Sequence, residues 1–291
     1  MLAKAAGLAA DEVILDLEDS VAAGAKGDAV RAAVAAALVV GPAARTRAVR
    51  VNAVGTRHCH RDVVGVMERA GASLDVIVLP KVDEPGQVGF VDHLLSALEA
   101  ELGLPDGGIA IEAQIETAAG LAAVEAIAAA CPRRLEALVL GPGDLAASLG
   151  MPHTTIGAPV AGYPGDGWHH VLGRILVAAR AHGLQAVDGP YAAIRDLAGL
   201  EESARRSRAL GYDGKWSIHP GQIAVLDAVY GVSGDDLGRA RRVLAAHAEA
   251  AERGHGAASL DGEMIDEATR AMAERVVAHA RLTGAEGDSG A

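Results

Sequence analysis

The chain has 291 residues, with 26 Lys and Arg against 38 Asp and Glu, a formal net charge of -12 at pH 7 and an aromatic content of 2%. This acidic balance, without a basic stripe, argues against nucleic acid or an anionic membrane as a partner, and the scarcity of aromatic residues argues against base stacking. No signal peptide and no apolar run of about 20 residues is found, so we expect a cytoplasmic protein without a membrane span.

Seven short strand-like runs follow one another along the chain, separated by Ala-rich stretches with helical spacing. They cover Glu12–Asp19, Ala48–Ala53, Val76–Val82, Ile109–Thr117, Leu135–Leu145, Leu184–Tyr191 and Gly214–Gln222. The alternation predicts one α/β domain over residues 1–231 with a parallel sheet. Eight strands close a TIM (β/α)8-type barrel, so either the first strand is missing or the barrel closes differently. Before the first run, Leu2–Leu8 is typical of the end of a helix.

Polar side chains gather toward the carboxyl end of each run. Because side chains alternate faces along a strand, several of them are expected to share a face. These sets are Asp16 with Glu18, Arg50 with Asn52, Glu112 with Gln114 and Glu116, and Ser217 with His219. Buried parallel strands are otherwise apolar almost throughout. Polar residues at the carboxyl ends of the strands favour a barrel with its active site at that mouth.

Two segments interrupt the alternation. The Gly- and Pro-rich loop Gly150–Gly167 is typical of an active-site lid. Beyond Gly231 the sequence predicts no strand, only the helices Asp235–Arg253 and Met264–Arg281, joined by a mobile hinge at Gly254–Gly262. Residues 232–291 are therefore expected to form a C-terminal helical extension.

The two cysteines, Cys59 and Cys131, indicate a reduced compartment more than a disulfide framework, although they could still pair. We expect both to be packing or surface thiols.

Glu116 and Asp144 follow consecutive strands, so their carboxylates are expected to converge at the mouth. Two carboxylates together with water and substrate oxygens are how Mg²⁺ is usually held. Helix N-capping at the strand–helix turns explains these two acids equally well. Arg50 could bind an anion or an enolate oxygen through its planar fork, or else form an ion pair with Asp16 or Glu18.

The chain resembles the citrate lyase beta-subunit-like family of CoA-ester lyases, which includes malyl-CoA and citramalyl-CoA lyases. The matching blocks occur in family order across nearly the whole chain. They are ILDLEDSV at Ile14–Val21 with Lys26 following, VRVN at Val49–Asn52, LPK at Leu79–Lys81, QIET at Gln114–Thr117, GPGDLA at Gly141–Ala146, DGPY at Asp188–Tyr191, IHPGQ at Ile218–Gln222 and DGEMID at Asp261–Asp266.

The resemblance implies a TIM barrel that assembles as a trimer or a dimer of trimers. It implies that Glu116 and Asp144 ligate Mg²⁺ and that Arg50 contacts the substrate carbonyl or thioester oxygen. Asp266 would be the general acid/base, delivered into a neighbouring subunit's site by the C-terminal tail. The implied reaction is a reversible aldol or Claisen cleavage of a 3-hydroxyacyl-CoA into a 2-oxo acid and an acyl-CoA.

We also assign Glu18 and Asp19 to the catalytic group, and Gly141 and Gly143 to substrate binding. Lys26 could contact a CoA phosphate or be a solvated helix lysine.

The sequence departs from the family pattern in three respects, of which the first is that the first strand, with the family's N-terminal block, is absent. Gly143 stands where the family commonly has an acidic residue, and Pro142 before it lacks an N–H. Three other activities stay open. One is a metal-dependent pyruvate aldolase, although a His in the first acidic motif of that class is replaced here by Asp19. The others are a malyl-CoA thioesterase and a citrate lyase beta-type subunit that needs an acyl-carrier partner.

Overall fold

The computed structural model describes residues 7–41, 44–152, 155–158 and 165–283. The predicted helix Leu2–Leu8 and the middle of the loop Gly150–Gly167 lie largely outside these ranges. The chain divides into two compact units, Met1–Val229 and Tyr230–Ala291. No helix in the described ranges is both long enough and apolar enough to cross a bilayer.

The described residues of the first unit form seven parallel strands that pair in chain order. They are β1 (Glu12–Asp16), β2 (Thr46–Arg50), β3 (Val76–Leu79), β4 (Ala110–Ile115), β5 (Leu135–Leu140), β6 (Gln185–Asp188) and β7 (Gly214–Lys215). In the described part of the chain β1 and β7 are the two edges of this sheet. The predicted fold class is confirmed: the sheet is an incomplete TIM-like barrel.

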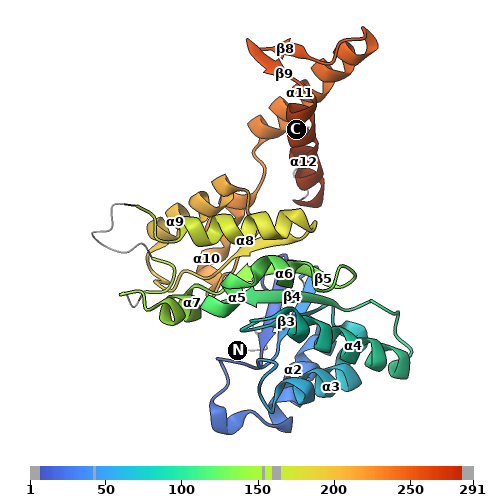
Figure 1. Ribbon diagram of the computed structural model, residues 1–291, viewed down its shortest axis with the longest axis vertical. Coiled ribbons are helices and arrows are strands. Elements are labelled where there is room, and N and C mark those ends of the chain that lie inside the picture. The colour runs from blue at the N-terminus through green and yellow to red at the C-terminus, as the bar shows by residue number, and fades with distance from the viewer. Residues whose placement is uncertain (1–6, 42–43, 153–154, 159–164, 284–291) are drawn as a thin grey trace. The chain divides into compact units, whose positions relative to one another are not determined.

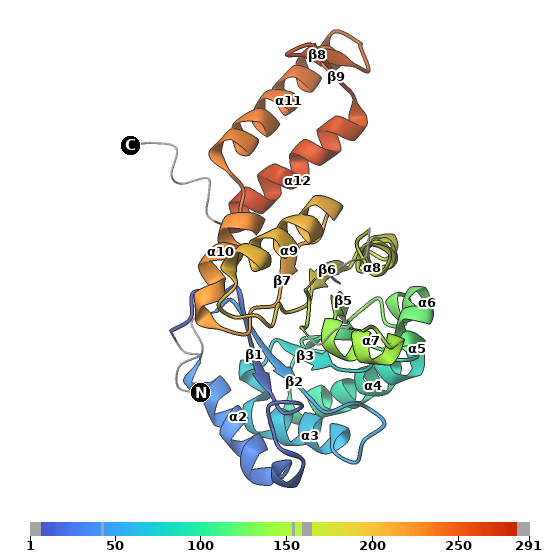
Figure 2. The same cartoon turned by 90° about the vertical axis from the view of Figure 1, so that its left-hand side faces the viewer.

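Helices follow the strands and lie outside the sheet, as Figures 1 and 2 show for α2 to α7. They are α2 (Asp28–Val40), α3 (Cys59–Ala70), α4 (Pro85–Leu102), α5 (Ala118–Ala122), α6 (Val124–Ala128), α7 (Pro142–Leu149), α8 (His169–Ala181), α9 (Leu197–Leu210) and α10 (Pro220–Tyr230). Short 3-10 turns, η1 (Ala23–Ala25) and η2 (Gly71–Ser73), complete the first unit.

The helix ends follow local sequence rules. Pro85 and Pro142 occupy the first turns of α4 and α7, where the missing N–H costs nothing. The Asp196 side chain accepts a hydrogen bond from the Gly199 N–H and so caps α9. Gly103 ends α4 in the left-handed conformation, at a φ of 66°. These residues fix where the helices begin and end, so that the chain can return to the sheet.

The barrel interior is filled by small and β-branched side chains. Ala48, Val76, Val78 and Ala110 form a buried cluster there, against which Ile14 and Trp216 pack. Cys59 and Cys131 are both buried and not disulfide-bonded, which confirms that they are packing thiols.

The predicted strands extend too far toward their carboxyl ends. β1 ends at Asp16 instead of Asp19, and β5 ends at Leu140 instead of Leu145. The predicted face shared by Ser217 and His219 on a strand is wrong, because β7 ends at Lys215 and the Ser217 hydroxyl donates to the His219 carbonyl, 2.9 Å away, in a turn. The motif residues therefore lie in the loops and helix starts that follow the strands.

Two glutamates from β1 and β4 meet inside the sheet. The carboxyl groups of Glu12 and Glu112 hydrogen-bond to each other, so the pair must hold a proton, and Glu136 of β5 adds negative charge. Burial is the main cause that raises the pKa of Glu12 to about 7, and burial also raises the pKa of Glu112. The folded protein therefore holds protons that the unfolded chain releases above about pH 4.5.

This pair should make stability depend on pH. The stabilisation is present below the unfolded pKa and is lost as pH rises through about 7. In Glu112→Gln the amide can donate to the Glu12 carboxylate at any pH. The unfolding free energy of this variant minus that of the wild type should rise by on the order of 2 kcal/mol when the pH is raised from 5 to 8. Urea unfolding at both pH values checks this, with Glu101→Gln at an exposed position of α4 as control. A difference that does not change with pH would contradict it.

As far as residue 283, the C-terminal unit contains two helices and a β-hairpin. They are α11 (Gly234–Glu252), β8 (Ala258–Leu260), β9 (Glu263–Ile265) and α12 (Glu267–Thr283). The prediction of no strand in this region is wrong. The backbone turns at Asp261, with φ 53°, and Gly262, with φ 84°, and two positive φ values at an Asp-Gly pair are what a tight hairpin requires.

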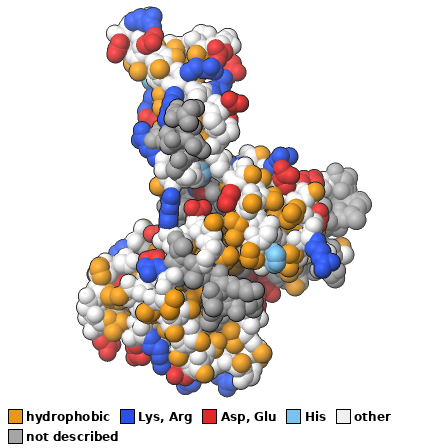
Figure 3. Space-filling model, turned by 180° about the vertical axis from the view of Figure 1, so that it is seen from behind, with side chains coloured by type: hydrophobic (Ala, Val, Ile, Leu, Met, Phe, Trp, Pro, Cys, Tyr) orange, Lys and Arg blue, Asp and Glu red, His pale blue; other side chains and the backbone are white. Residues whose placement is uncertain are grey.

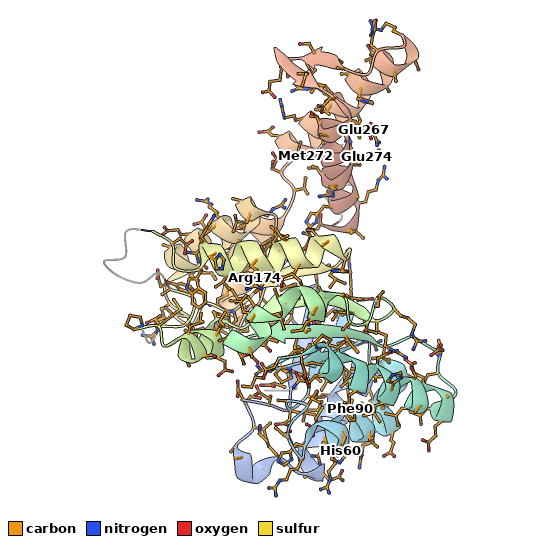
Figure 4. All side chains as sticks on the ribbon, in the orientation of Figure 1. His60, Phe90, Arg174, Glu267, Met272 and Glu274 are labelled. Atoms are coloured by element: carbon orange, nitrogen blue, oxygen red, sulfur yellow. The ribbon has the colours of Figure 1, made fainter. Side chains whose placement is uncertain are left out.

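This unit has a core of its own. Leu237, Ala240, Val243, Ile265, Ala273, Val277 and Ala280 form one buried cluster. The surfaces of both units carry charged and hydrophobic side chains side by side (Figure 3), and on α12 Glu267 and Glu274, both labelled in Figure 4, form ion pairs with Arg270.

Candidate active site

The two predicted metal ligands converge on one lysine. Glu116 directly follows β4, and Asp144 lies in the first turn of α7, after β5. The main-chain N–H of Lys81 donates to Glu116 Oε1 over 2.8 Å, while Lys81 Nζ lies 2.9 Å from Asp144 Oδ2. Lys81 follows β3, so three consecutive strands supply this group at one mouth of the sheet.

Glu116 is fixed in orientation. Gln114 Nε2 donates to Glu116 Oε2 over 2.7 Å, and the Glu116 residue is only 2% exposed. Burial is the main cause that raises the pKa of Glu116 to about 8, the nearby Lys81 charge acting in the opposite direction.

Gly141 allows the close approach at this point. A Cβ at Gly141 would lie 2.3 Å from Glu116 Oε2 and 2.9 Å from Gln114 Nε2. A residue with a side chain would therefore displace Glu116. The predicted role of Gly141 in substrate binding stays a prediction, but its steric role beside Glu116 is clear.

Arg50, at the end of β2, pairs with acids of the first motif. Its Nε and Nη2 lie 2.8 and 2.6 Å from the two carboxylate oxygens of Asp16, a bidentate contact, and Nη1 lies 3.3 Å from Glu18 Oε2. The guanidinium carbon lies 5.8 Å from the ring centroid of Trp216. Burial alone would lower the pKa of Arg50, but the hydrogen bonds and charge of Asp16 outweigh it and raise the pKa. The ion pair foreseen as the alternative role of Arg50 is thus present.

Glu18 and Asp19 differ in their surroundings. Glu18 is 5% exposed, and its Oε1 accepts from Lys81 Nζ over 2.5 Å. Burial raises the pKa of Glu18, against the opposing effect of Lys81. The side chain of Asp19 is 62% exposed, 3.7 Å from Arg50 Nη1 and 3.9 Å from Lys81 Nζ. Both predicted residues therefore lie at the same mouth as Arg50.

Lys26 belongs to a second polar chain beside the mouth. Its Nζ donates to Asn52 Oδ1 over 2.5 Å, and Asn52 Nδ2 in turn donates to Asp62 over 2.6 Å. Asp62 also accepts from Arg31 over 2.7 Å. Lys26 is thus held by a buried amide and is not a freely solvated helix lysine.

Asp266 lies in the C-terminal unit, between β9 and α12. Its Oδ1 accepts from the main-chain N–H of Thr269 at 3.0 Å and from the Thr269 hydroxyl at 2.9 Å, the contacts of a helix cap. Hydrogen bonds from Thr269 lower the pKa of Asp266, so the side chain is ionised at neutral pH. Its predicted delivery into a neighbouring subunit stays a prediction.

Lys81 lies at the site although no role was predicted for it from the sequence. The residue adopts a positive φ of 52°, an uncommon conformation for a residue with a side chain. The available signal was its place directly after the buried strand VIVL, where a charged residue at a strand end indicates function in a barrel.

The donor set fits a hard divalent cation. Glu116 and Asp144 supply carboxylate oxygens, and the buried Gln114 Oε1 nearby has no hydrogen-bond partner, while Glu18 Oε2 lies in the 3.3 Å ion pair with Arg50. Within the described residues no group of three or more His, Cys, Asp or Glu side chains is arranged to hold a metal. A two-carboxylate site completed by water and substrate oxygens suits Mg²⁺, which retains several such ligands.

Comparison with known proteins identifies the family. Residues 1–220 match the model of the HpcH/HpaI aldolase/citrate lyase family. The chain belongs to this family. It is accordingly a carbon–carbon lyase, which confirms the predicted reaction class. An L-malyl-CoA/beta-methylmalyl-CoA lyase of Cereibacter sphaeroides is 40% identical over 291 residues, covering 97% of this chain and 91% of the relative. A (3S)-malyl-CoA thioesterase of the same species is 36% identical, covering 98% of this chain and 91% of the relative.

A solved structure of a family member resembles the chain as a whole. CitE of Mycobacterium tuberculosis, in complex with magnesium, acetoacetate and coenzyme A, is 35% identical. The match covers 96% of this chain and 92% of that one, with a TM-score of 0.71.

Proposed function

We propose that the protein is a Mg²⁺-dependent lyase that cleaves or forms a 3-hydroxyacyl-CoA such as malyl-CoA or citramalyl-CoA, with a 2-oxo acid and an acyl-CoA as the other reactants. The observation that carries the proposal is the convergence of Glu116 and Asp144 at the mouth of the sheet, beside the guanidinium of Arg50. The malyl-CoA-cleaving relative and the magnesium, acetoacetate and coenzyme A bound to CitE support it.

Glu116 and Asp144 would hold the metal, which when bound acts as a Lewis acid toward the oxygens of the oxo-acid portion. Glu116 is presented for this by the Lys81 N–H and by Gln114, so its carboxylate is oriented before a ligand arrives. A preorganised ligand spends little free energy on reorganisation when charge develops in the reaction.

Asp266 would take the proton of the substrate hydroxyl. An ionised carboxylate is the form that accepts a proton, and the hydrogen bonds from Thr269 favour this form. The carbon–carbon bond then breaks, its electron pair moves into the acyl-CoA fragment as an enolate, and the hydroxyl carbon becomes the carbonyl of the 2-oxo acid. One proton, equal to the one taken from the hydroxyl, then adds to the enolate carbon and completes the acyl-CoA.

Arg50 would stabilise the enolate oxygen of the thioester. Its guanidinium has five N–H donors, and Asp16 holds it by two of them. The donors of Nη1, which lies 3.3 Å from Glu18 Oε2, and the positive charge would then act on the developing oxyanion. The two hydrogen bonds to Asp16 fix the plane of the Arg50 guanidinium.

Lys26 and Asn52 would serve substrate binding at the same mouth. Lys26 is the cation suited to a phosphate of coenzyme A, and its anchoring by Asn52 limits the side-chain entropy lost on binding. We further propose a homotrimer or a dimer of trimers, an assembly in which a neighbouring subunit can deliver Asp266.

The direct test is product analysis. Purified protein with Mg²⁺ and malyl-CoA should yield glyoxylate and acetyl-CoA, and citramalyl-CoA should yield pyruvate and acetyl-CoA. Chelation of the metal should stop both reactions. Cleavage only of CoA-free hydroxy-oxo acids would overturn the proposal in favour of an aldolase.

The thioesterase activity is the second candidate, because one relative at 36% identity carries that name. Free malate and free CoA, without glyoxylate, would be its products. Activity that appears only after an acyl-carrier protein is added would instead identify a citrate lyase beta-type subunit.

A further inference from the structure

The Lys81 ammonium lies close to the proposed metal ligand Asp144 and to two further carboxylates at the same mouth. Lys81 Nζ lies 2.5 Å from Glu18 Oε1 and 2.9 Å from Asp144 Oδ2, with Asp19 Oδ1 at 3.9 Å. A lysine ammonium is positively charged at neutral pH, and two of these carboxylates are within ion-pair distance of it at 2.5 and 2.9 Å.

The backbone of Lys81 is shaped for this position. Its φ of 52° lies in the left-handed region, where a residue with a side chain is destabilised. Contacts with the surrounding residues must offset this free-energy cost. The main-chain N–H holds Glu116 Oε1 at 2.8 Å, while the ammonium of the same residue reaches Asp144. One residue thus contacts both proposed metal ligands, by two different groups.

We propose that Lys81 is a built-in counter-cation that competes with the divalent metal for Asp144 and so sets the metal affinity of the site. This inference rests on the proposed assignment of Glu116 and Asp144 as metal ligands. Asp144 Oδ2 cannot keep a short contact with the ammonium and also bind a divalent ion side by side with it, because the two cations repel each other.

The two contacts of the ammonium divide its role. Asp144 has a side chain that is 41% exposed, so its contact with Lys81 can open to solvent. Glu18 is 7% exposed at the side chain and holds Lys81 by the shorter contact. Metal binding should therefore break the contact between Lys81 and Asp144, while Lys81 stays paired with Glu18. A negatively charged group of the substrate can then screen the repulsion between the ammonium and the metal ion.

Removal of the ammonium should tighten metal binding. Lys81→Met keeps the main-chain N–H that orients Glu116 and removes only the competing charge. A partly exposed ion pair contributes little, so the dissociation constant for Mg²⁺ should fall by about 3- to 10-fold. Lys81→Gln retains a hydrogen-bond donor for Glu18, and its dissociation constant for Mg²⁺ should fall by a similar factor. This second variant keeps the test valid if the more apolar Lys81→Met misfolds.

Two control variants separate competition from other effects. Lys81→Arg keeps the charge and should bind Mg²⁺ about as weakly as the wild type. Arg174→Met changes the net charge by the same amount as Lys81→Met, but Arg174 lies on α8, where it pairs with Glu125 at 3.0 Å (Figure 4). The dissociation constant of Arg174→Met for Mg²⁺ should stay within about twofold of the wild-type value.

Isothermal titration of the wild type, these four variants and Glu116→Gln with MgCl₂, as full-length proteins in buffer without substrate, measures the dissociation constant of each. Tighter binding by Lys81→Met and Lys81→Gln alone is the expected result. Equal or weaker binding by both overturns the competition and leaves the proposed function standing, provided that the wild type binds and Glu116→Gln does not. Absence of binding in the wild type and in both Lys81 variants overturns both proposals.

Discussion

Glu116→Gln should abolish Mg²⁺ binding and reduce kcat/KM by about 10³ or more. The substitution keeps the size of the side chain but replaces a carboxylate ligand by a neutral amide, and the loss of several kcal/mol of metal-derived stabilisation corresponds to that factor. The Gln amide can still accept a hydrogen bond from Lys81, so the local fold should persist. Calorimetric Mg²⁺ titration and steady-state kinetics with malyl-CoA measure the two effects.

Glu125→Gln is the matched control for this variant. Glu125 lies on α6 with a side chain that is 57% exposed and pairs only with Arg174 among the contacts of the described chain. The control should keep wild-type metal affinity and rate. Full activity of Glu116→Gln at saturating Mg²⁺ would remove Glu116 from the metal site.

Asp266→Asn should keep metal affinity and lose turnover. An amide cannot take the hydroxyl proton, and loss of a general base typically costs a factor of about 10² to 10⁴ in rate. Asn can still accept from Thr269 at the start of α12, so the cap and the fold of the C-terminal unit should survive. The measurement is kcat against the dissociation constant for Mg²⁺, with Asp261→Asn in the neighbouring hairpin turn as control.

A mixing experiment tests delivery of Asp266 from a neighbouring subunit. Asp266→Asn and Glu116→Gln subunits are each expected to be inactive alone. If the acid of one subunit serves the metal site of the next, mixed oligomers contain some sites with both residues intact and regain part of the activity. Mixtures with no activity, formed under conditions that exchange subunits, would place Asp266 in its own subunit's site or outside the reaction.

The fold was predictable because apolar runs and helical spacing repeat at regular intervals. VIVL at Val76–Leu79 is buried at all four positions, as a central parallel strand should be. The strand ends were not predictable from alternation alone, since polar residues such as Glu18 and Asp144 continue the pattern in loops and helix starts. The hairpin at Asp261-Gly262 carried a recognisable turn signal that the Gly-rich composition around it obscured.

The site was only partly predictable. Family blocks located Glu116, Asp144 and Arg50, and the structure brings them to one mouth. The role of Lys81 was not visible, because it depends on a positive φ and on the register of β3 against β4, which place its N–H on Glu116 and its ammonium on Asp144. Such convergence is a property of the folded chain and of no single segment.

Anomalous diffraction from crystals grown with Mn²⁺ in place of Mg²⁺, and with pyruvate, tests the central assignment most directly. The account predicts one strong peak about 2.1 Å from carboxylate oxygens of both Glu116 and Asp144, with Lys81 withdrawn from Asp144 and still on Glu18. A peak elsewhere, with Lys81 Nζ still in contact with Asp144, would contradict it.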